Sequence, residues 1–349
     1  MDIVFFTHKF LPDIGGVELT LARLSAAVSA LGHRVTVVTE SASEQVTLEG
    51  VTIVRLRVPT VRPFTRLLYW RWMWHHRALF QAADVLHFHD YGTFMHWFFP
   101  LRLLLRKPLY AMTFHGFDSW PVRRKDDLLR MLAARCMDVT FGCGAFIAKH
   151  YRQRVDHWYV GAPIRRPTVE AGAVVPSFLY VGRLADDTCI LQFARCLAEA
   201  ASGEPVRPQL TLVGDGPLKA AISAEAGTHC DLVFHGATAD VSSFIEAAGY
   251  VVATGFLAVL DAFAFERPVI APALTPIKRD YFASIPAVND LLVLASDEAE
   301  LVKVLRAVLE EPESQAMRSR VQRAKSFVDA LTWERIAAFH IRAYGRQAA

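Results

Sequence analysis

The segment from Thr254 to Ala271 has the pattern best suited to binding a phosphate group. Its sequence, TGFLAVLDAFAFERPVIA, follows an apolar run, YVVA, and turns into an apolar helix that carries one acid, Asp261. The backbone N–H groups of Gly255, Phe256 and Leu257, together with the positive end of the helix dipole, would point at one place. A buried turn of this form can also bind nothing. The pattern alone therefore leaves open a ligand site and a purely structural turn.

Further residues with binding chemistry occur where predicted strands end. Arg183 follows one strand, and its planar guanidinium suits a phosphate, although a surface ion pair with Asp186 or Asp187 is the alternative. Gly15 and Gly16 would let the backbone approach a ligand at the start of the first helix, or they would form a plain turn.

Histidines are prominent in the first half of the chain. His87, His89 and Asp90 spell HFHD, and alternation along a strand puts both histidines on one face. We nevertheless predict no bound metal. No Cys or His cluster elsewhere is needed to explain the two histidines, and the two adjacent aspartates named above are not spaced as an acidic metal-binding pair. His115 ends another strand, where it could reach a substrate or bond to backbone.

Short β-rich runs alternate with helical patterns along the whole chain. Strands are expected at residues 3–6, 34–40, 84–90, 109–116, 178–184, 209–217, 232–236, 250–255 and 267–272. The main helices are expected at 18–31, 190–201, 298–309, 312–327 and 332–344, the last with Thr332 as its N-cap. This alternation predicts an α/β fold with two doubly wound, Rossmann-like domains, whose carboxyl edges would face each other across a cleft.

The length of 349 residues exceeds what one compact core normally holds, so we expect two domains. The first would span residues 1–163. A segment rich in Pro, Gly and Ala follows, and residues 164–176 are predicted to be the linker. The second domain would span residues 177–330, and a helix at 331–349 would pack back on the first domain.

The composition excludes several classes of protein. A net charge of +3 argues against dedicated nucleic-acid binding. Cys136, Cys143, Cys189, Cys196 and Cys230 include no CxxC pair, so neither a disulfide framework nor a zinc site is expected. The N-terminal sequence lacks the basic start of a signal peptide. A cytoplasmic location is therefore expected.

Two aromatic and basic stretches could contact an anionic membrane. They are RPFTRLLYWRWMWHHRALF at residues 62–80 and WFFPLRLLLRK at residues 97–107. The alternative is that both are amphipathic helices packed on the first sheet, with their arginines extended towards water. No uncharged apolar run reaches the roughly eighteen residues of a membrane span. The expected association would thus be peripheral, at the inner face of the membrane.

Five motifs in order resemble those of the retaining glycosyltransferases of family 4, which have the GT-B fold. In the first half they are FLPDIGGVE (10–18) and TFHGFD (113–118). In the second half they are VGRL (181–184), LVGDGP (212–217, with Gly214) and LDAFAFERPVIAP (260–272). The likeness covers nearly the whole chain. It implies a transferase that binds a sugar nucleotide mainly with its second domain.

The resemblance also implies roles for individual residues. Arg183 would stabilise the departing diphosphate, Asp261 would hold the nucleotide ribose, and His115 would reach the transferred sugar. The loop at Gly15 and Gly16 would line the reaction centre. A transferase without a metal must use cations and aligned backbone donors for the diphosphate, which agrees with these roles.

The chain departs from the family pattern at two points of the donor site. Thr188 stands where the family has a lysine that joins the arginine on the diphosphate. Asp261 replaces the second of two glutamates, and a shortened loop leaves Ala253 or Thr254 at the first. Backbone N–H groups of the Gly255 turn would replace the lost glutamate. Lys278 or Arg279, shortly after the next strand, would supply the lost charge.

The sequence thus predicts an enzyme that moves a hexose-type sugar from a nucleotide diphosphate to a hydroxyl group. The donor would carry UDP or GDP, no cofactor or metal would be needed, and the acceptor would be a saccharide or a lipid-linked molecule. Two alternatives stay open: a non-catalytic relative that binds a sugar nucleotide or serves as a partner subunit, and a sugar-nucleotide epimerase.

Overall fold

The computed structural model describes residues 1–41, 47–59, 64–117, 121–165, 167, 177–203, 207–238 and 240–348. Its chain divides into two compact units, Met1–Gly161 with Thr332–Ala349, and Ala162–Leu331. Most of the predicted linker, Asp118 of the second motif, and the start of the first aromatic stretch lie outside the described residues.

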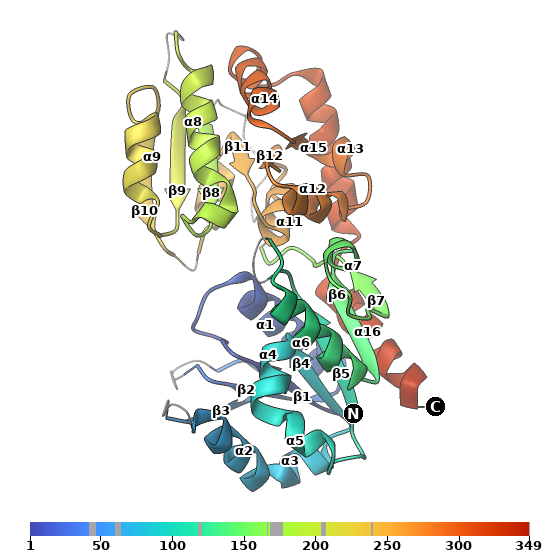
Figure 1. The fold of residues 1–349 in the computed structure, drawn as a ribbon. Helices are drawn as coiled ribbons and strands as arrows, with labels where there is room; N and C mark the ends of the chain where they lie inside the picture. Colours follow the sequence, from blue (N-terminus) through green and yellow to red (C-terminus); the bar gives the residue numbers. More distant parts are fainter. Residues whose placement is uncertain are drawn as a thin grey trace. The chain divides into compact units, whose positions relative to one another are not determined.

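The first unit is built on a seven-stranded parallel sheet (Figure 1). Its strands are β1 (Asp2–Thr7), β2 (Arg34–Thr39), β3 (Val51–Arg55), β4 (Val85–His89), β5 (Leu109–Phe114), β6 (Val139–Cys143) and β7 (His157–Tyr159). They lie in the order β3-β2-β1-β4-β5-β6-β7. The middle strands are apolar and buried because both faces of a parallel sheet are covered.

Helices follow the strands of the first unit. They are α1 (Gly16–Ala30), α2 (Thr65–His75), α3 (Arg77–Ala82), α4 (Tyr91–Thr93), the π-helix η1 (Phe94–Phe98), α5 (Phe99–Arg102), α6 (Arg124–Arg135), α7 (Phe146–His150) and α16 (Trp333–Ala348). The Thr332 hydroxyl accepts a hydrogen bond from the Arg335 N–H at 3.3 Å, as expected of an N-cap. From there α16 packs against α1, β5 and β6.

The second unit has a six-stranded parallel sheet in the order β10-β9-β8-β11-β12-β13. The strands are β8 (Ser177–Val181), β9 (Gln209–Val213), β10 (Asp231–Gly236), β11 (Tyr250–Val252), β12 (Val269–Pro272) and β13 (Val293–Ala295). The helices are η2 (Asp186–Thr188, 3₁₀), α8 (Ile190–Ala200), α9 (Lys219–Ala226), α10 (Ser242–Ala247), α11 (Phe256–Ala264), α12 (Pro276–Ala283), α13 (Val288–Leu291), α14 (Glu298–Glu310) and α15 (Gln315–Asp329).

Both sheets reverse their strand order once, which confirms the predicted doubly wound architecture. In the first unit the reversal lies between β1 and β4, and in the second between β8 and β11. Ligands of such sheets bind beyond the carboxyl ends of the strands on either side of the reversal. The fold therefore has two candidate ligand-binding edges, one in each unit.

Candidate functional site

The carboxyl edge of the second sheet brings the predicted donor-binding residues together. Strands β9, β8, β11 and β12 are neighbours in that order, and each adjacent pair is parallel. Arg183 follows β8, Gly214 follows β9, Thr254 follows β11, and Lys278 lies in the helix after β12. Residues almost a hundred positions apart thus share one edge, on both sides of the reversal.

Gly214 is required for the close approach of two loops at this edge. Its φ is 146°, a value that favours glycine. A Cβ there would come within 1.9 Å of the Gly182 carbonyl oxygen. The Gly182 N–H in turn donates to the Val213 oxygen at 3.0 Å. Gly214 therefore fixes the backbone that precedes Arg183.

The Arg183 guanidinium forms the ion pair that was the alternative to a phosphate contact. Its Nη2 lies 2.8 Å from Asp187 Oδ2, and the two side chains are 72% and 48% exposed. An exposed pair of this kind contributes about 0–1 kcal/mol, so a bound anion could replace Asp187 at little cost. Thr188, which stands where the family has lysine, turns its hydroxyl to the Ala185 carbonyl at 2.6 Å.

The first turn of α11 offers fewer free donors than the sequence suggested. Gly255 is its N-cap, with extended backbone. The Phe256 N–H donates to the Tyr281 hydroxyl at 2.8 Å, and the two rings stack with centroids 4.0 Å apart. Within the described residues, no hydrogen bond of the Gly255 or Leu257 N–H groups is found. The expectation of three free N–H groups is therefore corrected to two.

Lys278 brings a cation to the same turn. Its side chain is buried, and Nζ donates to the Thr254 carbonyl at 2.8 Å. Burial lowers the pKa of Lys278, while the nearby Cys189 and Asp187 act in the opposite sense. Arg279, the other proposed replacement, instead donates from Nη1 to the Ser296 carbonyl at 3.0 Å. Of the two, only Lys278 reaches the glycine turn.

The Asp261 carboxylate accepts hydrogen bonds from other groups of the protein. It is 3% exposed, and its Oδ1 accepts from the N–H groups of Ile164 and Arg165 at 2.6 and 3.1 Å. Oδ2 accepts from Arg165 Nη1 at 3.0 Å. Burial raises the pKa of Asp261 despite these donors. The sequence reasoning missed Arg165, which lies in the predicted linker. A basic residue in a segment otherwise rich in Pro, Gly and Ala was the signal that could have indicated a buried partner.

In the first unit, His115 belongs to a buried polar network at the ends of β4, β5 and β6. Its Nε2 lies 2.7 Å from His89 Nδ1, and its Nδ1 lies 3.6 Å from Cys143 Sγ. Burial, and then the charge of Arg130, lower the pKa of His115 to about 3. The ring is therefore neutral near pH 7, and both of its nitrogens have partners.

The first histidine of the HFHD strand segment has a structural setting. His87 is fully buried, with Nδ1 2.6 Å from the Tyr344 hydroxyl of α16 and Nε2 2.8 Å from Thr113 Oγ1. Across the described part of the chain, no three His, Cys, Asp or Glu residues are grouped so as to hold a metal ion.

The glycines before α1 are partly covered by an acid. Gly15 is the N-cap and has extended backbone, and Gly16 begins the helix. A Cβ on Gly15 would meet only the carboxylate end of Glu18, at 2.3 Å. Because this side chain is flexible, the loop has more freedom than the one at Gly214. Any anion approaching here would first have to displace Glu18.

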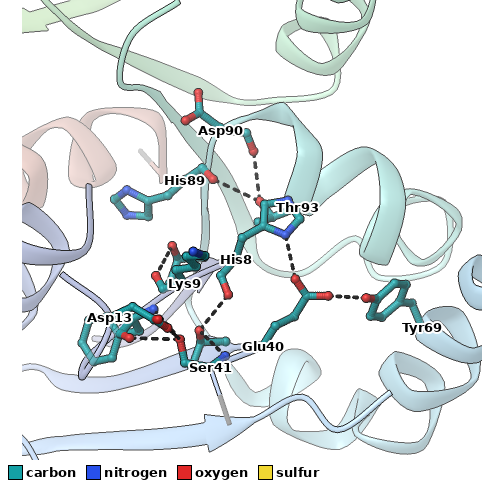
Figure 2. Close-up of polar contacts among 12 residues, drawn as sticks. His8, Lys9, Asp13, Glu40, Ser41, Tyr69, His89, Asp90 and Thr93 are labelled. Atoms are coloured by element: carbon teal, nitrogen blue, oxygen red, sulfur yellow. Dashed lines mark hydrogen bonds and ion pairs between the residues drawn. The ribbon is translucent and has the colours of Figure 1, made fainter. Parts of the chain in front are cut away.

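A cluster that sequence reasoning missed lies at the same edge of the first sheet (Figure 2). His8 follows β1 and Glu40 follows β2, and these strands pair with Thr7 opposite Thr39. His8 Nδ1 is 2.9 Å from Glu40 Oε2, and the Tyr69 hydroxyl donates to Glu40 Oε1. Polar residues at or just beyond the ends of the first two predicted strands, 3–6 and 34–40, were the signal that could have revealed it.

Known families and structures match the chain over nearly its whole length. Residues 14–163 match the model of Glycosyltransferase Family 4, and residues 175–311 match that of Glycosyl transferases group 1. No curated protein sequence matches the chain significantly.

Similar solved structures share the fold at low identity. A glycosyltransferase from Rickettsia africae has 11% identity and a TM-score of 0.74, covering 99% of this chain and 98% of its own. Sucrose-phosphate synthase from Thermosynechococcus elongatus has 17% identity and a TM-score of 0.75, with the same coverage. Anabaena HepE, in complex with UDP and glucose, has 14% identity and a TM-score of 0.74, covering 98% and 100%.

These matches agree with the two doubly wound sheets and with the order of the sequence motifs. The two family models together cover most of the chain, and both describe enzymes of one activity. The chain therefore belongs to the family 4 glycosyltransferases, as a divergent member with the GT-B fold.

Proposed function

We propose that this glycosyltransferase moves a hexose-type sugar from UDP or GDP to a hydroxyl group of a saccharide or lipid-linked acceptor, with retention and without a metal ion. The observation that carries the proposal is the position of Lys278, whose Nζ lies 2.8 Å from the Thr254 carbonyl in the glycine turn before α11. This places a cation beside the turn from which α11 begins, and a cation next to a helix N-terminus suits a diphosphate.

In this proposal the leaving diphosphate binds at the carboxyl edge of the second sheet. Arg183 exchanges its exposed partner Asp187 for the phosphates. Lys278 supplies the positive charge of the family's lysine, whose position is occupied by Thr188 in this chain. The N–H groups of Gly255 and Leu257 add donors aligned with the helix dipole. Two side-chain cations and these donors can offset the charge that a metal neutralises in other transferases.

Asp261 can serve as the ribose ligand only after a local exchange. Its Oδ1 would keep the N–H groups of the preceding segment, while Oδ2 would release the Arg165 guanidinium and accept from a ribose hydroxyl. His115 and the loop at Gly15 and Gly16 are proposed to line the reaction centre.

A peripheral membrane contact is proposed for the helices α2 and α5. Phe64, Leu67 and Trp74 are 57%, 55% and 48% exposed, and the exposed Arg71 lies on the same face of α2. Leu103, just after α5, is 68% exposed. Apolar side chains among arginines favour the interface of an anionic bilayer, as on the inner face of a membrane. None of the helices in the described residues is long and apolar enough to span one.

Calorimetry on the full chain tests the donor site. UDP-glucose, GDP-mannose and the free nucleotides are titrated into the protein in the presence of EDTA, and binding of at least one is expected. Arg183→Ala and Lys278→Met should each weaken it about tenfold or more, since each removes a charged contact. Arg306→Ala is the matched control, because Arg306 also forms an exposed ion pair in this unit, with Glu199.

Product analysis separates the alternatives. Transfer to a saccharide with an unchanged anomeric configuration supports the proposal. An altered nucleotide sugar formed without an acceptor would identify an epimerase, and binding without any turnover would identify a non-catalytic relative. Dependence on added metal after EDTA treatment would overturn the metal-free mechanism.

A further inference from the structure

The carboxyl edge of the first sheet carries a histidine and a carboxylate that the donor site does not use. Because β1 and β2 pair in register, His8 and Glu40 emerge side by side, one residue beyond Thr7 and Thr39. The Glu40 N–H also donates to the His8 carbonyl at 3.1 Å. The pair is thus placed by the sheet itself rather than by a free loop.

Glu40 determines which nitrogen of His8 carries the proton. Although burial alone would raise it, hydrogen bonds from His8 and Tyr69 hold the pKa of Glu40 below its usual value. An ionised carboxylate only accepts hydrogen bonds, so His8 Nδ1, at 2.9 Å, must be the donor. In the neutral ring, Nε2 therefore has a lone pair ready to accept a hydrogen bond.

The ring is held in place and yet accessible. His8 contacts the buried Trp97 edge-on, with centroids 4.8 Å apart. A Cβ at Gly92 would come within 2.9 Å of Nε2, so the glycine leaves room for the ring. The His8 side chain is 45% exposed and that of Glu40 32%. Within the described residues, no hydrogen-bond partner of Nε2 is found.

The surroundings favour a neutral partner over an anion. Figure 2 shows Glu40 and Asp90 on either side of His8, with Asp13 nearby on the loop after β1. Asp90 stands at the end of β4, next to β1 in the sheet, and its φ is 67°. A positive φ at a non-glycine residue is uncommon and is often found at binding sites. Asp90 is paired with Arg130 at 3.9 Å, and Lys9 also lies in this view, so the carboxylate that acts most directly on the ring is that of Glu40, 2.9 Å from Nδ1. Its negative charge would repel a phosphate but not a hydroxyl group.

We propose that His8, fixed in its Nδ1–H form by Glu40, accepts a hydrogen bond from the hydroxyl group of a neutral saccharide acceptor. This inference rests on the proposed transfer reaction and adds its acceptor side. His8 binds the acceptor, and Glu40 is a positioning residue that acts through it. The same edge carries His115, the residue proposed for the reaction centre, one strand beyond Asp90.

The test uses the full chain with methyl glucoside and methyl mannoside as neutral probes and inorganic phosphate as the anionic one. Saturation-transfer NMR should detect binding of the glycosides to the unmodified chain. Added phosphate should not reduce this signal, and the signal should be lost in His8→Ala. In transfer assays, His8→Ala should raise the KM for the glycoside about tenfold, the loss of one hydrogen bond, and leave the donor Kd unchanged. His229→Ala, an exposed histidine of the second unit, is the control.

Two more variants distinguish binding from a structural effect. His8→Gln keeps an acceptor atom near the position of Nε2, so its KM for the glycoside should lie between those of the unmodified chain and His8→Ala. Glu40→Gln should raise KM about threefold with kcat retained, because the ring loses its fixed tautomer. An unchanged glycoside signal and KM in His8→Ala, or competition by phosphate, would overturn the inference. If the unmodified protein bound no sugar nucleotide, the donor proposal would be refuted instead.

Discussion

At the carboxyl edge of the first sheet, histidine rings lie beside carboxylates such as Glu40, whereas at the carboxyl edge of the second sheet a buried lysine lies at a glycine turn. In the first, His115 is shared between His89 and Cys143, and burial keeps it uncharged. In the second, Lys278 is fixed to a backbone carbonyl and Asp261 to the N–H groups of its neighbours. Uncharged rings suit hydroxyl-bearing ligands and fixed cations suit a diphosphate, which is the difference that the proposed transfer from a charged donor to a neutral acceptor requires.

The largest expected effect comes from breaking the charged framework of the second unit. Asp261→Ala removes a buried carboxylate that accepts from two N–H groups and from the partly buried Arg165, which should lower the free energy of unfolding by about 3 kcal/mol or more. Urea denaturation followed by far-UV circular dichroism measures this loss. Asp187→Ala, which breaks an exposed pair in the same unit, should cost under about 1 kcal/mol. Equal losses would show that Asp261 does not hold this unit together.

The next largest contrast is the loss of stability when alanine replaces a glycine at each edge. Gly214→Ala forces a side chain against the Gly182 carbonyl at a φ of 146°, and should cost about 2–4 kcal/mol. Gly15→Ala meets only the movable end of Glu18 in extended backbone, and should cost about 1 kcal/mol or less. Thermal unfolding of both variants checks the contrast. A larger loss for Gly15→Ala would reverse our reading of the two loops.

A different kind of effect, dependent on pH, should appear in the first unit as the pH falls. Burial lowers the pKa of His115 to about 3 and that of His340 to about 4, and also lowers those of His87 and His89. The unfolded chain binds these protons near pH 6.5 while the folded unit does not. Stability is therefore complete above about pH 6.5 and declines towards pH 4, by at most about 1.4 kcal/mol per pH unit for each histidine.

Tryptophan fluorescence can follow this loss separately. All seven tryptophans fall within residues 1–161 and 332–349, so their emission reports on the first unit alone. His340→Gln should reduce the acid sensitivity, whereas His235→Gln, an exposed histidine of the second unit, should not. A tryptophan transition independent of pH between 4 and 7 would contradict the neutral network.

The sequence predicted the framework better than the contacts at its edges. Long apolar runs such as β1 and β9 were recognised because buried parallel strands have continuous hydrophobic sequences. Strands β3, β6, β7 and β13 were missing from the prediction. Strand β3 is only partly buried, β7 and β13 have three residues each, and β6 is a short run that contains Gly142, so none gave a clear pattern.

At the candidate site, the sequence indicated which residues gather but not what each one touches. Arg183, Gly214 and Lys278 share an edge because parallel strands end together, a consequence of topology alone. The bond between Asp261 and Arg165 joins residues 96 positions apart, and no local pattern encodes it. The pairing of His8 with Glu40 depends on the register of β1 and β2, which became known only with the sheet.

The most direct test of the account is donor binding measured by calorimetry in four proteins: the unmodified chain, Lys278→Met, Arg306→Ala and His8→Ala. We predict that a UDP or GDP sugar binds the unmodified chain, that Lys278→Met weakens this binding about tenfold or more, and that the other two variants leave it unchanged. Binding that is equal in all four proteins, or absent from the unmodified chain, would contradict a donor site at the glycine turn of the second unit.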